Sequence, residues 1–274
     1  MSVSEHPVAL TIERRVGGAT TLLATVMALP LLDGLFVALL LAGTLETTVG
    51  MLETGLLVFG GSATVAVILA ELDEGRRSMV RSVLLIGAGL IPLAAVQAII
   101  APTIESALEL AIFQRFAGVV ILAIAARTVS AKVSDYLPSP GVIILLGLLA
   151  SVRPAALTVE VVVDADLLAR AAITAGIGVT FALAVALAAP ALRGVVDLDR
   201  FRFGSAVALG VFALPVVGVF DTDAPIALAV LVVSGLLAYS PDGDDEPDDD
   251  PAEPPESATD TDYTSDDTAR APWL

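Results

Sequence analysis

The sequence predicts an all-α fold, a polytopic membrane bundle of about eight transmembrane helices. Hydrophobic residues make up 56% of the 274-residue chain, charged residues only 16%, and the mean hydropathy is +0.88. Water-soluble domains usually have about a quarter of their residues charged. Long apolar runs separated by short connections, with basic residues in alternate connections, indicate the same class.

A membrane-spanning helix needs about 20 mainly apolar residues. The predicted spans cover about 18–43, 54–72, 82–101, 107–128, 140–163, 169–191, 203–220 and 223–239. The last two are short and joined by a tight turn, so they alternatively form one re-entrant hairpin. This transmembrane domain, 18–240, follows a cytoplasmic segment, 1–17, and precedes an acidic tail, 241–274.

The first span resembles a signal peptide because Arg14 and Arg15 precede it. However, the apolar run is longer than a signal peptide, contains Asp33 and lacks a convincing cleavage site. We therefore expect an uncleaved first helix.

The loop charges predict the orientation, because cytoplasmic loops are rich in Arg and Lys. Alternate connections hold Arg14, Arg15, Arg76, Arg77, Arg81, Arg127, Lys132, Arg193, Arg200 and Arg202. The other connections hold Glu46, Glu53, Glu105, Asp164, Asp166, Asp221 and Asp223, and Arg170 is the exception. The pattern predicts a cell-membrane protein with both termini in the cytoplasm.

Each outward-going span contains one central proline. These residues are Pro30, Pro92, Pro154 and Pro215, at spacings of 62, 62 and 61 residues. One interpretation is a two-helix hairpin used four times. The alternative is that short loops alone give any eight-span chain such a spacing. In either case proline removes a backbone hydrogen bond, which predicts helix breaks whose freed carbonyls line a cavity.

Asp33 is the strongest candidate for a functional residue. It lies three residues after Pro30 and directly before Gly34, so the first span is expected to unwind at the carboxylate. An ionisable group near the bilayer centre costs about 2.5–3.5 kcal/mol and usually faces a cavity or a partner. Asp33 is expected to bind a cation, carry a proton, or pair with an arginine.

Three further polar residues complete the predicted pathway. Arg153 precedes Pro154 deep in the fifth predicted span, where it is either the salt-bridge partner of Asp33 or an anion site. Glu160 follows in the same span. Gln97, in the third span, is expected to bond between helices or line the pathway.

Several classes of function are excluded or disfavoured by composition. The chain has no cysteine, and its one histidine, His6, precedes the first span, so the usual ligands of zinc and haem are missing. No catalytic motif is present. We expect no enzymatic activity, no cofactor and no metal site. The net charge of −17 lies largely in the tail, and an acidic chain repels nucleic acid.

The text SPDGDDEPDDDPAEPPES after span eight predicts a disordered, solvated tail. The segments ALPLLDGLF and SVRPAALTVEVVVDAD, together with this tail, resemble a family of uncharacterised haloarchaeal multi-pass membrane proteins. That resemblance implies a membrane location and a halophilic source, with no known activity.

The favoured hypothesis is a secondary transporter or permease for a small ion or solute, with the lipid bilayer as the other partner. The alternative is a membrane scaffold in which the polar residues are structural ties and the tail is a docking segment.

Overall fold

The computed structural model describes residues 18–70, 75–153, 163–219 and 224–241, all within the compact unit Met1–Asp242. These residues form helices with no strand. Pro154, Glu160 and the acidic tail lie outside the described residues.

The first span consists of two helices separated by a break. Helix α2 covers Gly18–Leu32 and α3 covers Leu35–Leu41. Between them Gly34 has φ 84°, a left-handed conformation that glycine adopts without strain. The break therefore lies at the Asp-Gly pair that follows Pro30, where the sequence predicts unwinding.

The second span is also irregular. A 3₁₀ turn, η1 (Thr44–Glu46), leads into α4 (Thr48–Glu53), which continues as the π-helix η2 (Thr54–Phe59). Helix α5 (Ser62–Ala70) follows after Gly60 and Gly61, at an angle of 45°. This span begins six residues before its predicted start, so Glu53, predicted in a loop, lies inside it.

The remaining long helices form two sets of three, here called unit A and unit B. Unit A has α6 (Arg76–Ser106), α7 (Leu110–Val129) and α9 (Pro140–Ser151), with the short α8 (Ala131–Tyr136) between the last two. Unit B has α10 (Ala165–Leu192), α11 (Leu198–Val217) and α12 (Ile226–Leu237). The helix lengths are 31, 20 and 12 residues in unit A and 28, 20 and 12 in unit B.

In each unit an isolated β-bridge joins the chain just after the third helix to the loop between the first two helices. In unit A the bridge joins Leu108 and Val152, and in unit B it joins Val196 and Tyr239. The N–H of Glu109 donates to the Ser151 carbonyl at 2.7 Å. The corresponding bond in unit B runs from the N–H of Asp197 to the Ala238 carbonyl, at 2.8 Å.

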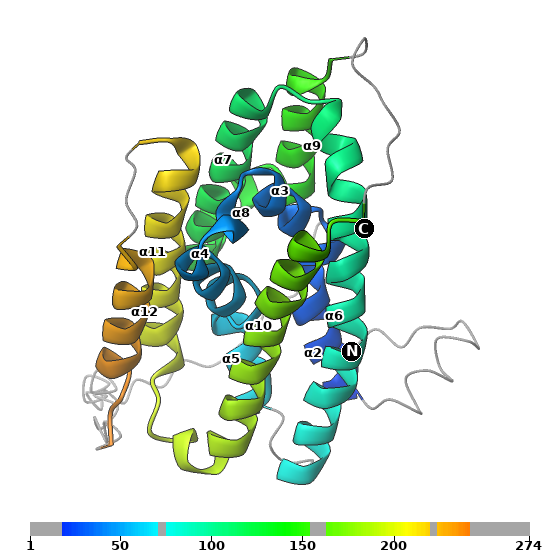
Figure 1. The fold of residues 1–274 in the computed structure, drawn as a ribbon. Helices are drawn as coiled ribbons and strands as arrows, with labels where there is room; N and C mark the ends of the chain where they lie inside the picture. The colour runs from blue at the N-terminus through cyan, green and yellow to red at the C-terminus, as the bar shows by residue number, and fades with distance from the viewer. Residues whose placement is uncertain (1–17, 71–74, 154–162, 220–223, 242–274) are drawn as a thin grey trace, which may run out of the picture. The chain divides into compact units, whose positions relative to one another are not determined.

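The two units are inverted copies, with equivalent residues 86 to 89 positions apart. Figure 1 shows α6 and α10 side by side but running in opposite directions, and the same holds for α7 and α11. An odd number of helices per unit places successive copies in opposite orientations. We call the end of the bundle where α6 begins the basic end. Its residues include Arg76, Arg77, Arg81, Arg193 and Arg200. The opposite end, where α10 begins, is called the acidic end, and its residues include Glu46, Glu105, Glu109, Asp164 and Asp166.

Small residues permit close contact between and within the units. A Cβ at Gly118 of α7 would lie 2.3 Å from Val217 Cγ2 of α11, and one at Gly87 of α6 would lie 2.6 Å from Val179 Cγ1 of α10. Because glycine has no side chain, these helix backbones approach closely, as is usual in membrane bundles.

The broken spans divide between the units. Helices α2 and α3 pack against α6, and α3 also contacts α7 and α9 of unit A. Helices α4 and α5 and the π-helix η2 pack against α10, with further contacts to α11 and α12 of unit B. The two spans meet through the fully buried rings of Phe36 and Phe59, whose centroids are 5.4 Å apart.

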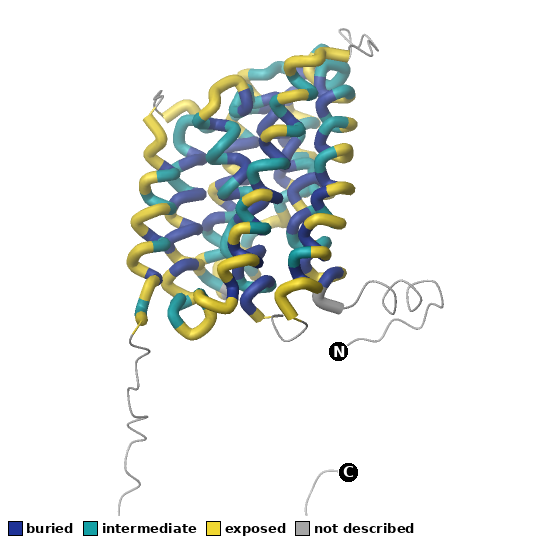
Figure 2. The backbone as a smooth tube through the Cα atoms, turned by 60° about the horizontal axis from the view of Figure 1, so that its bottom comes forward, coloured by how far each residue is buried: buried dark blue, intermediate teal, exposed yellow. Residues whose placement is uncertain are grey.

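The outward faces of the helices are apolar, as a bilayer requires. Figure 2 shows exposed residues along the outer sides of the helices and buried residues along their inner sides. Large hydrophobic side chains that are more than half exposed include Leu85, Leu145, Leu149, Val232 and Leu236. Exposed apolar surface on this scale marks contact with lipid or a partner. By length and composition, five helices in the described part of the chain are long and apolar enough to cross a membrane, or six if the bent pair α4–η2 and α5 is one span.

Pro92 and Pro215, two of the four prolines predicted to break helices, both lie inside helices. Helix α6 continues through Pro92, which lies on an exposed face, so this proline does not end the helix. Pro215 lies two residues before the end of α11, a 20-residue helix that is long and apolar enough to cross a membrane. The four-hairpin repeat stays a prediction, because the visible correspondence is between three-helix units.

Candidate functional site

Asp33 lies at the break between α2 and α3, half-buried, where it organises the backbone. Its N–H continues the α2 pattern by donating to the Leu29 carbonyl at 2.9 Å. Its carboxylate Oδ1 accepts the N–H of Leu35 at 3.0 Å. Asp33 thus caps α3, since a carboxylate readily accepts the N–H groups left free at a helix start.

Gln97 of α6 binds the same break. Its Nε2 donates to the Leu31 carbonyl at 2.7 Å, a carbonyl whose helical partner would be the N–H of Leu35. The other amide atom, Oε1, is buried and has no hydrogen-bond partner among the described residues. Buried polar atoms are normally satisfied, so an unpartnered oxygen on a residue that binds the break is a candidate ligand atom.

The hydrogen bond to Gln97 also gives the depth of the break. Gln97 is nine residues before the end of α6, which corresponds to about 14 Å at 1.5 Å per residue. This distance is about half the thickness of a hydrocarbon core, which is about 30 Å.

The break also faces the start of α9, the short helix of unit A. A Cβ built at Gly141 would lie 3.9 Å from the Asp33 carbonyl oxygen, and one at Gly34 would lie 3.8 Å from Ile144 Cγ2. Gly141 is in the first turn of α9, which begins with Pro140. The positive end of the α9 dipole is therefore beside the break.

Arg153 is not the partner of Asp33. It follows the C-terminal end of α9 and forms an ion pair with Glu109 of the α6–α7 loop. Asp33 is at the other end of that helix, about 18 Å away for 12 residues. The apolar run in the sequence continues to 163, which placed Arg153 deep in the predicted span. The helix itself ends at Ser151, so Arg153 lies beyond its end.

The Arg153–Glu109 pair belongs to the acidic end, where both side chains are partly exposed. It borders an open cavity of about 370 Å³ that Glu105 also lines. An exposed pair of this kind contributes little to stability, about 0–1 kcal/mol, and is not part of the central break.

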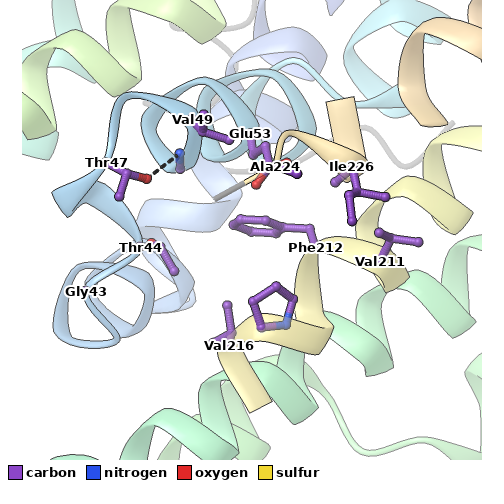
Figure 3. Close-up of a pocket in the computed structure, with 13 residues that line it drawn as sticks. Gly43, Thr44, Thr47, Val49, Glu53, Val211, Phe212, Val216, Ala224 and Ile226 are labelled. Atoms are coloured by element: carbon purple, nitrogen blue, oxygen red, sulfur yellow. Dashed lines mark hydrogen bonds between the residues drawn. The ribbon is translucent and has the colours of Figure 1, made fainter. Parts of the chain in front are cut away.

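A second carboxylate, Glu53, lines a cavity at the acidic end (Figure 3). The cavity has a volume of about 120 Å³ and lies between the loop after α3, the end of α11 and the start of α12. The Glu53 carboxylate accepts hydrogen bonds from the backbone of Leu228 and Ala227, in the first turn of α12. Sequence reasoning missed this residue because it counted Glu53 as a loop acid.

The available ligand atoms are those of isolated carboxylates with nearby amide, hydroxyl and carbonyl oxygens. No three His, Cys, Asp or Glu side chains gather in the part of the chain that the structure describes. Such oxygen groups suit a proton or a hard monovalent cation better than a transition metal.

A family of unknown function, DUF5794, matches residues 90–217. The matched segment runs from within α6 to the end of α11 and includes Gln97, but neither broken span. No curated protein and no solved structure shows a significant match. The chain is therefore similar, over residues 90–217, to proteins of a family whose function is unknown.

Proposed function

We propose that this protein is a secondary transporter or permease for a small ion or solute, with Asp33 as its coupling carboxylate. The observation that carries the proposal is the position of Asp33, at a helix break near the middle of the bundle. An ionisable residue inside a membrane is costly, and such residues commonly belong to ion or substrate pathways.

The arrangement around the break supports the same function. Many secondary transporters consist of inverted repeats, with discontinuous helices at the substrate site between them. Here two interrupted spans lie against two inverted three-helix units. In this proposal the units move against each other around the two breaks, and Asp33 and Gln97 bind the transported or coupling species.

The same proposal includes eight spans with both termini in the cytoplasm. Helices α9 and α12 are about 18 Å long, shorter than a hydrocarbon core. However, α7 ends at the basic end and α10 begins at the acidic end, so the chain returns through α9. The bridge from Tyr239 to Val196 similarly supports a return of α12 to the basic end.

Single-cysteine variants test this topology, because the chain contains no cysteine of its own. In intact cells or right-side-out vesicles, Ala165→Cys is expected to react with a membrane-impermeant maleimide. Ser78→Cys and Tyr239→Cys are expected to react only after permeabilisation. Labelling of Tyr239→Cys together with Ala165→Cys would show that α12 does not cross.

Ligand binding and flux test the function itself. The protein, purified in detergent at high KCl as its acidic composition suggests, is heated with a panel of cations, anions, amino acids and pH values. A ligand at 100 times its Kd stabilises by about 2.7 kcal/mol. Liposomes containing the protein should then take up that ligand faster than empty liposomes. No stabilising ligand and no flux across the panel would contradict the proposal.

Deletion of residues 241–274 separates transport from scaffolding. We expect the truncated protein to keep its flux and its melting temperature, since the pathway residues lie in the membrane domain. A scaffold that acts through its tail would instead keep its fold and lose its partner. Loss of flux in a correctly folded truncation would therefore count against the transporter as described.

A further inference from the structure

The inverted units place Asp33 and Glu53 in equivalent surroundings. Gly141 is in the first turn of α9, and Leu228 is in the first turn of α12, 87 residues later. Asp33, on the first broken span, lies against Gly141. Glu53, on the second broken span, is hydrogen-bonded to Leu228. In unit A the start of the short helix lies near the Asp33 backbone carbonyl, and in unit B it donates to the Glu53 carboxylate.

Glu53 differs from a simple helix cap because it also borders a cavity (Figure 3). Among the residues that the structure describes, the cavity's polar side chains are Glu53, Thr44 and Thr47, and Glu53 is the only charged one. The remaining lining is apolar, including Val211, Phe212 and Val216 of α11. A single carboxylate in apolar walls favours a ligand with one positive charge.

The hydroxyl groups are oriented so that oxygen lone pairs remain available. The Thr44 hydroxyl donates to the Leu39 carbonyl at 2.8 Å, so its oxygen can accept or coordinate. The Thr47 oxygen accepts the Gly50 N–H at 3.0 Å and has a second lone pair. Carboxylate and hydroxyl oxygens are ligands for hard cations.

Gly50 keeps this loop folded against α4. A Cβ at position 50 would lie 1.8 Å from the Thr44 carbonyl oxygen, so a side chain there would displace the loop. The wall that carries Thr44 and Thr47 is therefore fixed to the helix that carries Glu53. The polar groups of the cavity come from one continuous stretch of chain, whereas its apolar wall comes from unit B.

The cavity size limits the ligand. A water molecule takes about 30 Å³ in the liquid, so 120 Å³ holds about four waters or a partly hydrated ion. Glu53 is five residues after the start of α4, about 8 Å along the helix, and thus closer to the acidic end than Asp33 is.

We propose that Glu53 binds a monovalent alkali cation in this cavity, as the inverted counterpart of Asp33 and the first site that a cation meets from the acidic end. This inference rests on the proposed transport function. It adds a second carboxylate to the pathway, on the second broken span.

The test measures melting temperature of the full-length protein against increasing Na⁺ or K⁺, with N-methylglucamine replacing the cation at constant ionic strength. Wild type is compared with Glu53→Gln, which keeps an oxygen to accept the α12 N–H groups and removes only the charge. The matched control is Glu46→Gln, because Glu46 is exposed and outside the cavity lining. In Asp33→Asn, part of the rise in melting temperature with added cation should survive. We expect Glu53→Gln to lose this part of the rise, and Glu46→Gln to keep it.

A second measurement reports occupancy of the cavity directly. Val49→Cys lies in the lining and is expected to react with an impermeant maleimide from the acidic end. Saturating Na⁺ or K⁺ should slow this reaction severalfold, and Glu53→Gln should abolish the protection. Unchanged protection in Glu53→Gln would overturn the inference.

Other outcomes separate this inference from the proposed function. If Glu53→Gln lowers the melting temperature equally at all cation concentrations, Glu53 is a helix cap and the cation site is overturned. The proposed transport function would be unaffected by this result if flux still depends on Asp33. A dependence on pH alone would overturn the alkali cation in favour of a proton. Cation protection of Val49→Cys that depends on Glu53, without any flux, would support the site and contradict the transporter.

Discussion

Asp33→Asn is expected to abolish flux while leaving the protein folded and inserted. Asparagine is nearly isosteric and retains an Oδ1 that can accept the Leu35 N–H, so the cap on α3 survives. What disappears is the negative charge at the central break. A charged hydrogen-bonding interaction worth roughly 3 kcal/mol corresponds to about a 100-fold loss in affinity for a cation or coupled solute.

The measurement is uptake into liposomes, with protein yield and melting temperature recorded for the same preparation. Asp135→Asn is the matched control, because Asp135 is an exposed carboxylate on α8. A folded Asp33→Asn protein with normal flux would remove Asp33 from the mechanism. Aggregation or failed insertion would instead favour the structural role that the scaffold hypothesis assigns to it.

Gly118→Val is expected to cause the largest loss of stability. The new Cβ would lie 2.3 Å from Val217 Cγ2 and 2.8 Å from the Val217 backbone nitrogen. A side chain can change rotamer, but a helix backbone must move as a whole, which would separate α7 from α11. Overpacking of this kind typically costs 1–3 kcal/mol, and we expect roughly 3 kcal/mol here.

Gly210→Val in α11 is the control, since a Cβ there meets nothing within 4 Å. Both variants carry the same cost of a β-branched residue in a helix, so their difference reports the contact between α7 and α11. The free energy of unfolding is measured in mixed detergent micelles. Equal stabilities would mean that α7 and α11 do not approach as closely as described.

The all-helical class and the presence of several long apolar helices could be predicted from the sequence, because a bilayer requires apolar runs of a known length. The predicted span that begins at 140 is longer than its helix. Its apolar text continues to 163, but the helix stops at Ser151, where the chain pairs with the α6–α7 loop. Hydropathy does not report such a pairing, so Arg153 was placed too deep.

The inverted relation between the units leaves little trace in the sequence. Phe116 of α7 packs on Gly147 of α9, whereas at the equivalent contact Gly204 of α11 packs on Ser234 of α12. The small residue is on the third helix in unit A and on the second helix in unit B. The close contact between the helices is therefore retained, whereas the local sequence is not. The evenly spaced prolines were a stronger pattern but corresponded to no shared geometry at Pro92.

The site was predicted in part for a similar reason. Asp33 stood out because it is a charge within an apolar run, and the break at Gly34 follows from the Asp-Gly pair. Glu53 did not, because it ends α4, and the π-helix that directly follows it depends on packing against α10: a Cβ at Gly55 would lie 2.7 Å from Ile177 Cγ2. Composition alone does not indicate that contact.

The odd number of helices in each unit has a consequence for evolution. A duplicated three-helix segment inserts its second copy upside down without any change in the fold, so only the charges at its ends need to diverge. The start of α6 reads RRSMVR, whereas the start of α10 reads ADLLAR. The two helix starts therefore differ in charge, as expected for helices that begin on opposite sides of a membrane.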